Sequence, residues 1–193
     1  ALYLARQSLS YRLIGQTRDD AAGEAFDKVA KLLGLGYPGG PLIERAARAG
    51  DPAAIPFPLA QIADGAPDFS FSGIKTAVSL FVRKHRPLSE QLSADIAASF
   101  QAAVVKALVR KTVKAAVSLG VRRVLLTGGV AANKALRSAL NAEAEARNWE
   151  IFIPPPSLCT DNAAMIAAAG HARLQAGARA TLSMNAVPDL KLA

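Results

Sequence analysis

The feature that most constrains the fold of this chain is an alternation of strand-like and helix-like segments in its last third. Val124, Leu125 and Leu126 form the apolar centre of a segment that we expect to be a buried strand. Short joints rich in glycine or proline separate the successive segments. Such an alternation predicts a parallel α/β unit with right-handed crossovers. The expected segments are a strand at 122–126, a helix at 130–147, a strand at 150–153 and a helix at 161–175.

The clearest helix is predicted upstream of this unit, from about Ser89 to Leu119. Apolar residues recur every four positions along one stripe, and Gly120 is expected to follow the helix as its C′ residue. The stripe comprises Leu92, Ile96, Phe100, Val104 and Leu108. Before this helix we expect a strand at 9–17, with its start at Ser8, and a helix at 21–33 capped by Asp19 or Asp20. A tight loop at 34–41 and a helix at 42–49 are expected next. An irregular crossing at 50–68, a short strand at 69–73 and a helix at 74–84 complete this part of the chain.

Composition excludes several classes of protein. Of the 193 residues, 51% are hydrophobic and 20% are charged, which excludes a disordered tail. Cys159 is the single cysteine, so no internal disulfide can form and a cytoplasmic location is expected. No apolar run approaches 18 residues and no signal peptide is evident, so we expect no membrane partner. The net charge of +8 favours an anionic partner such as nucleic acid or a nucleotide.

The first candidate site is the turn that follows the strand at 122–126. Gly128 and Gly129 stand where the strand ends and a helix begins, so a flat ligand or a phosphate can approach the backbone. Asn133 follows on the first turn, where its amide can bind a ligand or simply cap the helix. A plain tight turn explains the two glycines equally well.

The second candidate is a set of acidic residues near the predicted helix at 21–33. Asp20, Glu24 and Asp27 are spaced four and three residues apart, which places them on one helix face. Three acids on one face repel each other unless cations, a metal or hydroxyl donors lie nearby. A solvated first turn, with Lys28 and Lys31 as partners, is the simpler explanation.

The third candidate is Asp161, at the start of the last predicted helix. An acid in this position usually caps the helix, although it can also bind a metal. The two histidines, His85 and His171, are not spaced to help it, because His171 lies about 15 Å along the helix and off its face. Cys159 has no evident base partner, and no Ser/His/Asp triad can be assembled.

Basic residues form three runs, which are usually solvated surface. The run at 83–86 closes a predicted helix, where cations are favoured by the helix dipole. No aromatic residues interleave with these runs, so stacking on single-stranded bases is not supported. The three runs are Arg83-Lys84-His85-Arg86, Arg110-Lys111 with Lys114, and Arg122-Arg123.

Five motifs, taken together and in order, resemble the tRNA threonylcarbamoyladenosine transferase family, formerly called O-sialoglycoprotein endopeptidases. The resemblance spans roughly residues 9–178. The motifs are GQTRDDAAGEAFDK at 15–28, YPGGP at 37–41, FSFSGIKTA at 69–77, GGVAAN at 128–133 and CTDNAAMIA at 159–167.

This resemblance implies an actin/hexokinase/Hsp70-type α/β fold, with two lobes that each have an RNase H-like core. It also implies a reaction. The family transfers a threonylcarbamoyl group from threonylcarbamoyl-AMP to N6 of the adenine next to the anticodon, in tRNAs that decode codons beginning with A. The partners implied are tRNA, threonylcarbamoyl-AMP (or ATP or ADP at the same site), and the partner subunits of the transfer complex.

The resemblance also assigns roles to individual residues. Asp27 and Gly40 match nucleotide contacts, Glu44 matches an acidic position near the ribose, and Asn133 matches a further nucleotide contact. Gly128 and Gly129 are expected to face the adenylate, and Glu24 lies in the acidic motif close to the site. Asp161 matches the carboxylate ligand of one divalent metal, either iron or zinc.

One departure from the family pattern limits these roles. The family's metal site also uses a His-x-x-x-His pair in an N-terminal lobe, and neither this pair nor that lobe's phosphate-binding loop occurs in the 193 residues. We therefore interpret the chain as the C-terminal lobe with part of the lobe junction, the N-terminal lobe being absent. Within it we expect a helical, insertion-like region at about 20–118 and an α/β lobe that closes with about 119–178. Such a piece is expected to be inactive alone, because one carboxylate does not hold a metal firmly.

Two other functions remain open at this stage. A lobe of a small-molecule kinase with the same fold would also place Asp27 and the two glycines near a nucleotide. A non-enzymatic lobe that docks partner subunits is a third interpretation, and its exposed apolar face would favour self-association.

Overall fold

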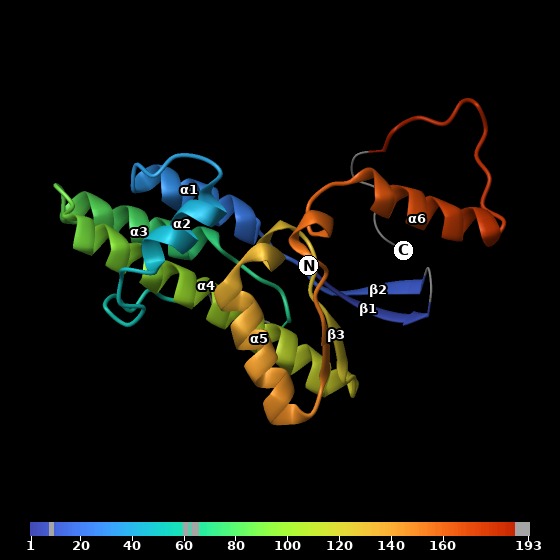
Figure 1. The fold of residues 1–193 in the computed structure, drawn as a ribbon, viewed down its shortest axis with the longest axis horizontal. Coiled ribbons are helices and arrows are strands. Elements are labelled where there is room, and N and C mark those ends of the chain that lie inside the picture. The colour runs from blue at the N-terminus through green and yellow to red at the C-terminus, as the bar shows by residue number, and fades with distance from the viewer. Residues whose placement is uncertain (8–9, 60–61, 63–65, 188–193) are drawn as a thin grey trace.

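Four helices form a closely packed layer at one end of the molecule (Figure 1). The structure is a computed structural model and describes residues 1–187 except 8–9, 60–61 and 63–65. The predicted start of the first strand and parts of the crossing at 50–68 therefore lie outside the described residues. The four helices are α1 (Ala22–Leu32), α2 (Gly39–Ala47), α3 (Ser72–Lys84) and α4 (Glu90–Leu119).

The core of this layer forms where α1, α2 and α3 meet the first half of α4. Phe26 of α1 meets Phe100 of α4 edge to face, with 5.1 Å between ring centroids. Ile43 of α2 and Val78 of α3 are fully buried in the same cluster. Substituting any of these side chains by alanine would remove apolar burial and leave a cavity, so the helices depend on one another for stability.

Helix α4 confirms the predicted periodicity. Ser89 caps it, since its Oγ accepts a hydrogen bond from the Leu92 N–H at 3.1 Å. Gly120 ends it in the left-handed conformation, with φ at +66°, as a glycine after a helix commonly does. By length and composition alone α4 could cross a membrane, with a mean hydropathy of 1.4 over 18 residues. Half of that window is buried inside the protein, as is usual for the central helix of a packed core.

The expected α/β unit follows α4. Strands β3 (Arg123–Leu125) and β4 (Glu150–Phe152) pair in parallel, and α5 (Lys134–Arg147) lies between them in sequence. Helix α5 packs on the second half of α4 through a smaller cluster that includes Val105 and Leu140. The parallel pairing confirms the prediction, and the chain is an α/β protein with helices and small sheets.

The expectation that the strand at 122–126 is buried was wrong. Leu125 is 65% exposed, and Phe152 of β4 is 51% exposed. The two strands form a sheet of their own, which α5 and α4 do not enclose from all sides. These apolar side chains therefore remain accessible in the described part of the chain.

Three predicted helix starts also needed correction. Helix α2 begins at Gly39, inside the expected loop, because Pro38 is extended and its successor already has helical geometry. Helix α5 begins at Lys134, after a short 3-10 turn at Gly129–Ala132, because Asn133 is extended and caps the helix. Helix α1 begins after Ala21, with neither Asp19 nor Asp20 as its cap.

An N-terminal hairpin was missed by the sequence analysis. Strand β1 (Leu2–Gln7) pairs antiparallel with β2 (Ser10–Gly15), the strand that was expected at 9–17. The predicted strand at 69–73 shrinks to a single bridge between Phe69 and Thr17.

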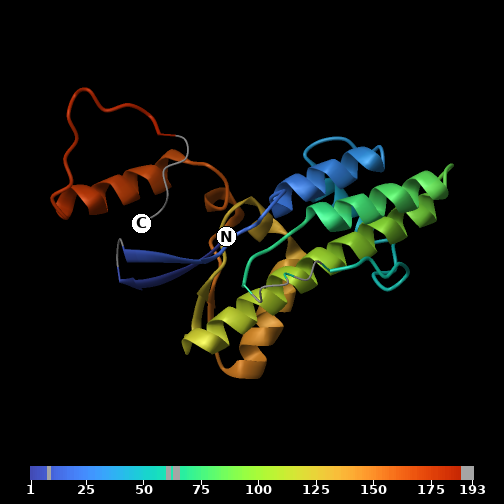
Figure 2. The same cartoon turned by 180° about the vertical axis from the view of Figure 1, so that it is seen from behind.

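The last predicted helix lies at the surface. Helix α6 (Ala163–Gln175), which follows a 3-10 turn at Pro156–Leu158, has no buried residue. With the hairpin it lies on the side opposite α1–α3 (Figure 2). Asn162 rather than Asp161 caps it, since the Asn162 Oδ1 accepts a hydrogen bond from the Met165 N–H at 2.9 Å.

Candidate nucleotide-facing site

The glycine turn lies at the carboxyl end of β3, as predicted, and is open. Gly128 has φ at +89°, a conformation that side chains other than glycine rarely adopt. A Cβ added to Gly128 or Gly129 would have no neighbour within 4 Å. Both residues are exposed. The turn therefore presents accessible backbone next to the start of a helix, which is where anionic groups bind favourably.

Asn133, on the other side of this turn, is buried and already bonded. Its Oδ1 accepts a hydrogen bond from the Leu136 N–H at 2.9 Å, which caps α5. Its Nδ2 donates to Gln101 Oε1 of α4 at 2.7 Å. Only 7% of the residue is exposed. The capping role that the sequence left open is thus confirmed, and a nucleotide contact by the same amide stays a prediction.

Glu44 is brought to the same turn by α2. Its Oε2 accepts a hydrogen bond from the backbone N–H of Lys134, the first residue of α5, at 3.2 Å. Its other oxygen lies 3.8 Å from an Arg48 guanidinium nitrogen. A carboxylate is stabilised at a helix N-terminus, where free N–H groups carry partial positive charge. The contact joins α2 to the α/β unit and leaves 17% of the Glu44 side chain exposed.

Asp27 and Gly40 lie beside each other at the junction of α1 and α2. The Asp27 Oδ1 accepts a hydrogen bond from the Gly39 N–H at 2.7 Å, so Asp27 caps α2 from the neighbouring helix. Gly39 packs tightly there, since a Cβ on it would lie 2.5 Å from the Asp27 Cα. A Cβ on Gly40 would have no neighbour within 4 Å. Gly39 therefore serves helix packing, and Gly40 borders open space.

Two other acidic residues of the first motif, Asp20 and Glu24, are neutralised by lysines. The Lys28 Nζ lies 2.8 Å from an Asp20 oxygen and 2.7 Å from Glu24 Oε1, and Lys75 lies 3.3 Å from Asp20. The hydrogen bond from Lys28 lowers the pKa of Asp20, and the same contact raises the pKa of Lys28. The simpler explanation of this acidic face therefore holds for Asp20 and Glu24 with Lys28 as their partner, but the second cation is Lys75 of α3 and not the expected Lys31, and Asp27 turns toward α2.

These segments converge on one region. The first turn of α1 approaches the 3-10 turn, where a Cβ on Gly23 would lie 3.6 Å from a methyl carbon of Val130. Helix α2 reaches Lys134 through Glu44. The structure thus brings the first turn of α1 and helix α2 to the same end of α5, although α5 lies far along the chain from both.

Arg137 was not identified from the sequence, yet it organises this end of the molecule. From the first turns of α5 its Nε donates to the Ala131 carbonyl, and one of its terminal nitrogens lies 3.3 Å from the Pro154 carbonyl. The same nitrogen lies 3.7 Å from the buried Sγ of Cys159. It thereby holds together the segments that follow β3 and β4. A cation near a helix N-terminus is disfavoured by the helix dipole, and this unusual position was the feature of the sequence that could have marked Arg137.

Asp161 follows Cys159 by two residues in sequence and is exposed. Within the described ranges, no group of three histidine, cysteine or acidic side chains is placed to hold a metal ion. Such sites need three or more ligands. The residues present therefore do not fit a metal by themselves, and Asp161 as a metal ligand stays a prediction.

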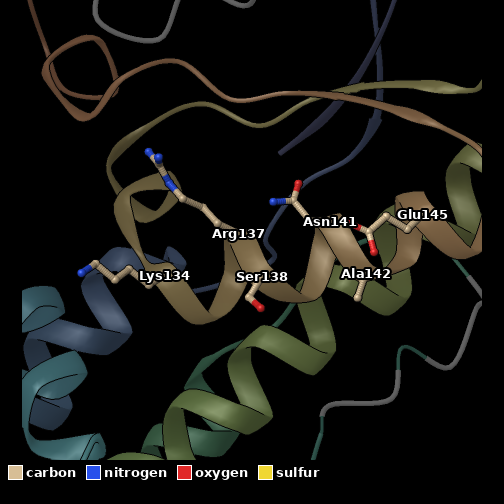
Figure 3. A pocket seen from close by; sticks show the side chains of 6 residues that line it. All are labelled: Lys134, Arg137, Ser138, Asn141, Ala142 and Glu145. Carbon is tan, nitrogen blue, oxygen red and sulfur yellow. The ribbon is translucent and has the colours of Figure 1, made fainter.

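A shallow hollow of about 450 Å³ runs along α5 (Figure 3). All six residues that line it belong to α5 itself, and most of them are polar. None of the residues assigned to the adenylate lines it. Ligand pockets are usually built from several elements and lined mainly by apolar groups, so this hollow does not match the predicted site. It is lined by Lys134, Arg137, Ser138, Asn141, Ala142 and Glu145.

Comparison with solved structures identifies the class of fold. The chain is similar to T. kodakarensis HypF, with a TM-score of 0.60 and 21% identity over 82% of this chain and 20% of that one. It is also similar to full-length HypF in the phosphate- and nucleotide-bound form, with a TM-score of 0.55 and 18% identity over 73% and 18% of the two chains. At these identities the likeness concerns the α/β fold alone.

Comparison of sequences identifies the family. The model of the tRNA N6-adenosine threonylcarbamoyltransferase family matches residues 1–168, and the chain belongs to that family. Relatives of that name from Symbiobacterium thermophilum, Moorella thermoacetica and Thermotoga neapolitana are 59%, 53% and 47% identical. The alignments cover 93%, 94% and 99% of this chain and 52%, 53% and 58% of the relatives. The chain thus spans about half the length of the curated relatives it matches.

Proposed function

We propose that the complete protein to which this chain belongs transfers a threonylcarbamoyl group from threonylcarbamoyl-AMP to N6 of the adenine next to the anticodon, in tRNAs that decode codons beginning with A. The observation that carries the proposal is the family match over residues 1–168. The net charge of +8 supports a polyanionic substrate, since tRNA binding depends on phosphate contacts. A cytoplasmic location, partner subunits and the absence of a membrane partner are part of the same proposal.

The proposed fold is an actin/hexokinase/Hsp70-type lobe with an RNase H-like core. In this proposal residues 20–118 form a helical insertion-like region, and residues 119–178 close the α/β lobe. A further lobe, outside these 193 residues, would supply the phosphate-binding loop and the His-x-x-x-His pair. The relatives' extra length supports this, because this chain covers only 52–58% of the three relatives named above.

The adenylate is proposed to bind where α1, α2 and the start of α5 converge. Gly128 and Gly129 would admit a phosphate or the base to the backbone, and Gly40 borders open space on the facing helix. Carboxylates accept hydrogen bonds from ribose hydroxyls, a role that suits Asp27 and Glu44. Each carboxylate has one oxygen on a backbone N–H, and the second oxygen of Glu44 also lies 3.8 Å from an Arg48 guanidinium nitrogen, which a ligand hydroxyl would have to share. Asn133 would contact the nucleotide with the hydrogen-bonding capacity that its two present bonds leave unused. Glu24 would lie close to the bound adenylate.

The proposed reaction needs no protein nucleophile. The exocyclic amine attacks the carbamoyl carbon, the new C–N bond forms, and the bond from that carbon to the phosphate oxygen breaks. AMP leaves with the electron pair of that bond, and the amine loses one proton to solvent. Cys159, the one thiol, is 3% exposed and lies against Arg137 and the Pro154 carbonyl, which is consistent with a structural role.

The experiment that tests the proposal compares the complete polypeptide with the 193-residue chain. Each is incubated with threonylcarbamoyl-AMP and an unmodified tRNA, and the modified nucleoside is measured by mass spectrometry. We expect product with the complete polypeptide and none with the 193 residues alone. Product from the 193 residues would contradict the division between lobes, and no product from either would contradict the proposed function.

Two alternatives are distinguished by a parallel incubation with ATP and a small-molecule acceptor. ADP formation from ATP with a small-molecule acceptor would indicate a kinase lobe. A docking lobe would give neither product, and its apolar sheet face would mediate self-association. The exposed Leu125 and Phe152 favour such association for the 193 residues when they are studied alone.

A further inference from the structure

The second half of α4 carries a stripe of cations that the proposed transfer site does not use. Lys106, Arg110 and Lys114 recur every four residues and are all exposed. Four residues of helix advance about 6 Å, so the three charges span about 12 Å on one face. Val105 and Val109, each one position before a stripe residue and about 100° from it around the helix, pack on α5, and the stripe residues themselves stay exposed.

The stripe is free of the usual partners of surface cations. No ion pair joins any of its three residues to a carboxylate in the part of the chain that the structure describes. From residue 96 to 119 the helix contains four basic residues and no acidic one. Its acids, Glu90 and Asp95, lie in the first two turns. Like charges at four-residue spacing destabilise a helix slightly, so folding alone does not favour this arrangement.

The helix dipole does not explain the stripe either. Cations are favoured in the last turn of a helix, within one turn of its C-terminus. The last turn of α4 has no basic residue. Three cations of the shorter helices do follow the dipole, since Lys31 closes α1 and Arg83 and Lys84 close α3. The stripe residues differ from these three cations, because the dipole does not favour their positions.

Lys111, which lies between the stripe residues in sequence, has a different role. Its Nζ donates to the Asp68 carbonyl and lies 5.7 Å from the Phe69 ring centroid. Burial lowers the pKa of Lys111, and the neighbouring Arg110 and Lys114 lower it further. It fastens the segment before α3 to α4, so among the four basic residues of α4 the three stripe residues remain available to an external anion.

We propose that Lys106, Arg110 and Lys114 form a docking surface for the sugar–phosphate backbone of the tRNA substrate. This inference rests on the proposed function, which supplies the polyanion. Evenly spaced, unpaired cations on a rigid helix match a backbone of repeating phosphates, and contacts of this kind position a nucleic acid without reading its sequence. The surface holds the tRNA body while the adenine beside the anticodon occupies the site at the start of α5.

The test uses the complete polypeptide and an unmodified tRNA, with binding followed by fluorescence anisotropy at several salt concentrations. The stripe variant carries K106Q, R110Q and K114Q. A matched control carries K31Q, R83Q and K84Q, which removes the same charge from helix C-termini. For the stripe variant we expect about a tenfold weaker affinity at low salt and a salt dependence reduced by about 2 in log–log slope. The control is expected to retain the wild-type slope.

The outcomes separate this inference from the proposed function. A stripe variant with wild-type affinity and slope overturns the inference, while product formation by the wild type keeps the function. An equal loss in both variants also overturns it, since net charge would then be responsible. In a parallel assay with anionic lipid vesicles, a stripe variant that loses vesicle binding but keeps its tRNA affinity assigns the surface to a membrane and overturns the inference as well. Equal thermal midpoints of the wild type and the two variants would show that the substitutions change binding and not folding.

Discussion

Asp19 and Ser72 are 53 residues apart in sequence, yet the Ser72 Oγ donates a hydrogen bond of 2.7 Å to Asp19 Oδ2. The other oxygen, Oδ1, accepts hydrogen bonds from the N–H groups of Phe71 and Ser72 at 2.7 and 3.2 Å. The segment before α1 therefore caps the N-terminus of α3. Burial would raise the pKa of Asp19, but the hydrogen bonds from Ser70, Phe71 and Ser72 outweigh it and lower the pKa to about 2.

This cap makes the stability of the fold depend on pH. The folded pKa of about 2 is below the ordinary 3.8, so ionised Asp19 stabilises the fold above about pH 4 and this contribution is lost as the pH falls toward 2. Asp19→Ala is expected to lower the free energy of unfolding by about 1 kcal/mol at pH 7. Urea unfolding at pH 7 and pH 3 measures both effects. If the free energies of unfolding of the variant and the wild type differ by the same amount at pH 7 and at pH 3, the assignment is contradicted.

Two adjacent glycines are expected to respond oppositely to alanine. Gly39→Ala places a methyl group 2.5 Å from the Asp27 Cα and 2.6 Å from the Phe26 carbonyl oxygen, which should destabilise the fold by about 1–3 kcal/mol. Gly40→Ala meets no atom within 4 Å and should leave the stability unchanged or raise it by up to about 1 kcal/mol. Thermal unfolding of both variants tests this. If Gly40 borders the adenylate, its variant binds the nucleotide more weakly while it remains stable.

The structural role of Asp27 and its proposed ligand-binding role can be tested separately. In Asp27→Asn the amide oxygen can still accept the Gly39 hydrogen bond of 2.7 Å, so the thermal midpoint should fall by only a few degrees at most. The charge that would accept ribose hydroxyls is lost, so adenylate affinity in the complete polypeptide should fall about tenfold. Calorimetric titration measures it. Unchanged affinity in this variant, with lost stability in Asp27→Ala, would show that Asp27 serves only as a cap.

Arg137 is expected to control access to Cys159. Arg137→Met removes the donors to the Ala131 and Pro154 carbonyls and should lower the free energy of unfolding by about 1–3 kcal/mol. Because Cys159 is 3% exposed and lies against Arg137, its reaction with a thiol reagent should become at least several-fold faster. Arg123→Met is the control, since Arg123 pairs with Glu150 on the surface. Equal labelling rates in both variants would contradict this role.

Much of the secondary structure could be predicted from the sequence, because helices depend on local periodicity. The apolar residues that recur from Leu92 to Leu108, together with Gly120, locate α4 almost to the residue. Strand β2 was expected, but β1 and its pairing with β2 were missed, because a six-residue strand gives only a weak local signal. The burial of β3 was overestimated, since an apolar strand indicates a buried position only when other elements cover both faces of its sheet.

The members of the candidate site come from the family resemblance, and their roles as ligand contacts stay predictions. Resemblance selected Asp27, Gly40, Glu44 and Asn133, and their segments do converge at the start of α5. The bonds themselves could not be predicted, since Glu44 meets Lys134 from 90 residues away. Arg137 and Gln101 were missed because no local pattern marks a side chain that bonds a distant carbonyl or amide.

By itself the sequence determined the family, the helical periodicities and the alternation that pairs β3 with β4 in parallel, since these depend on residue type and spacing along the chain. Only the tertiary structure decided that Asp19 caps α3, that Asp27 caps α2, and that Asn133 is already bonded to Gln101. The physical reason is that a carboxylate or an amide bonds whichever donor or acceptor the packed helices bring within about 3 Å. That choice depends on the packing of Phe26, Phe100 and their neighbours, which no local pattern encodes.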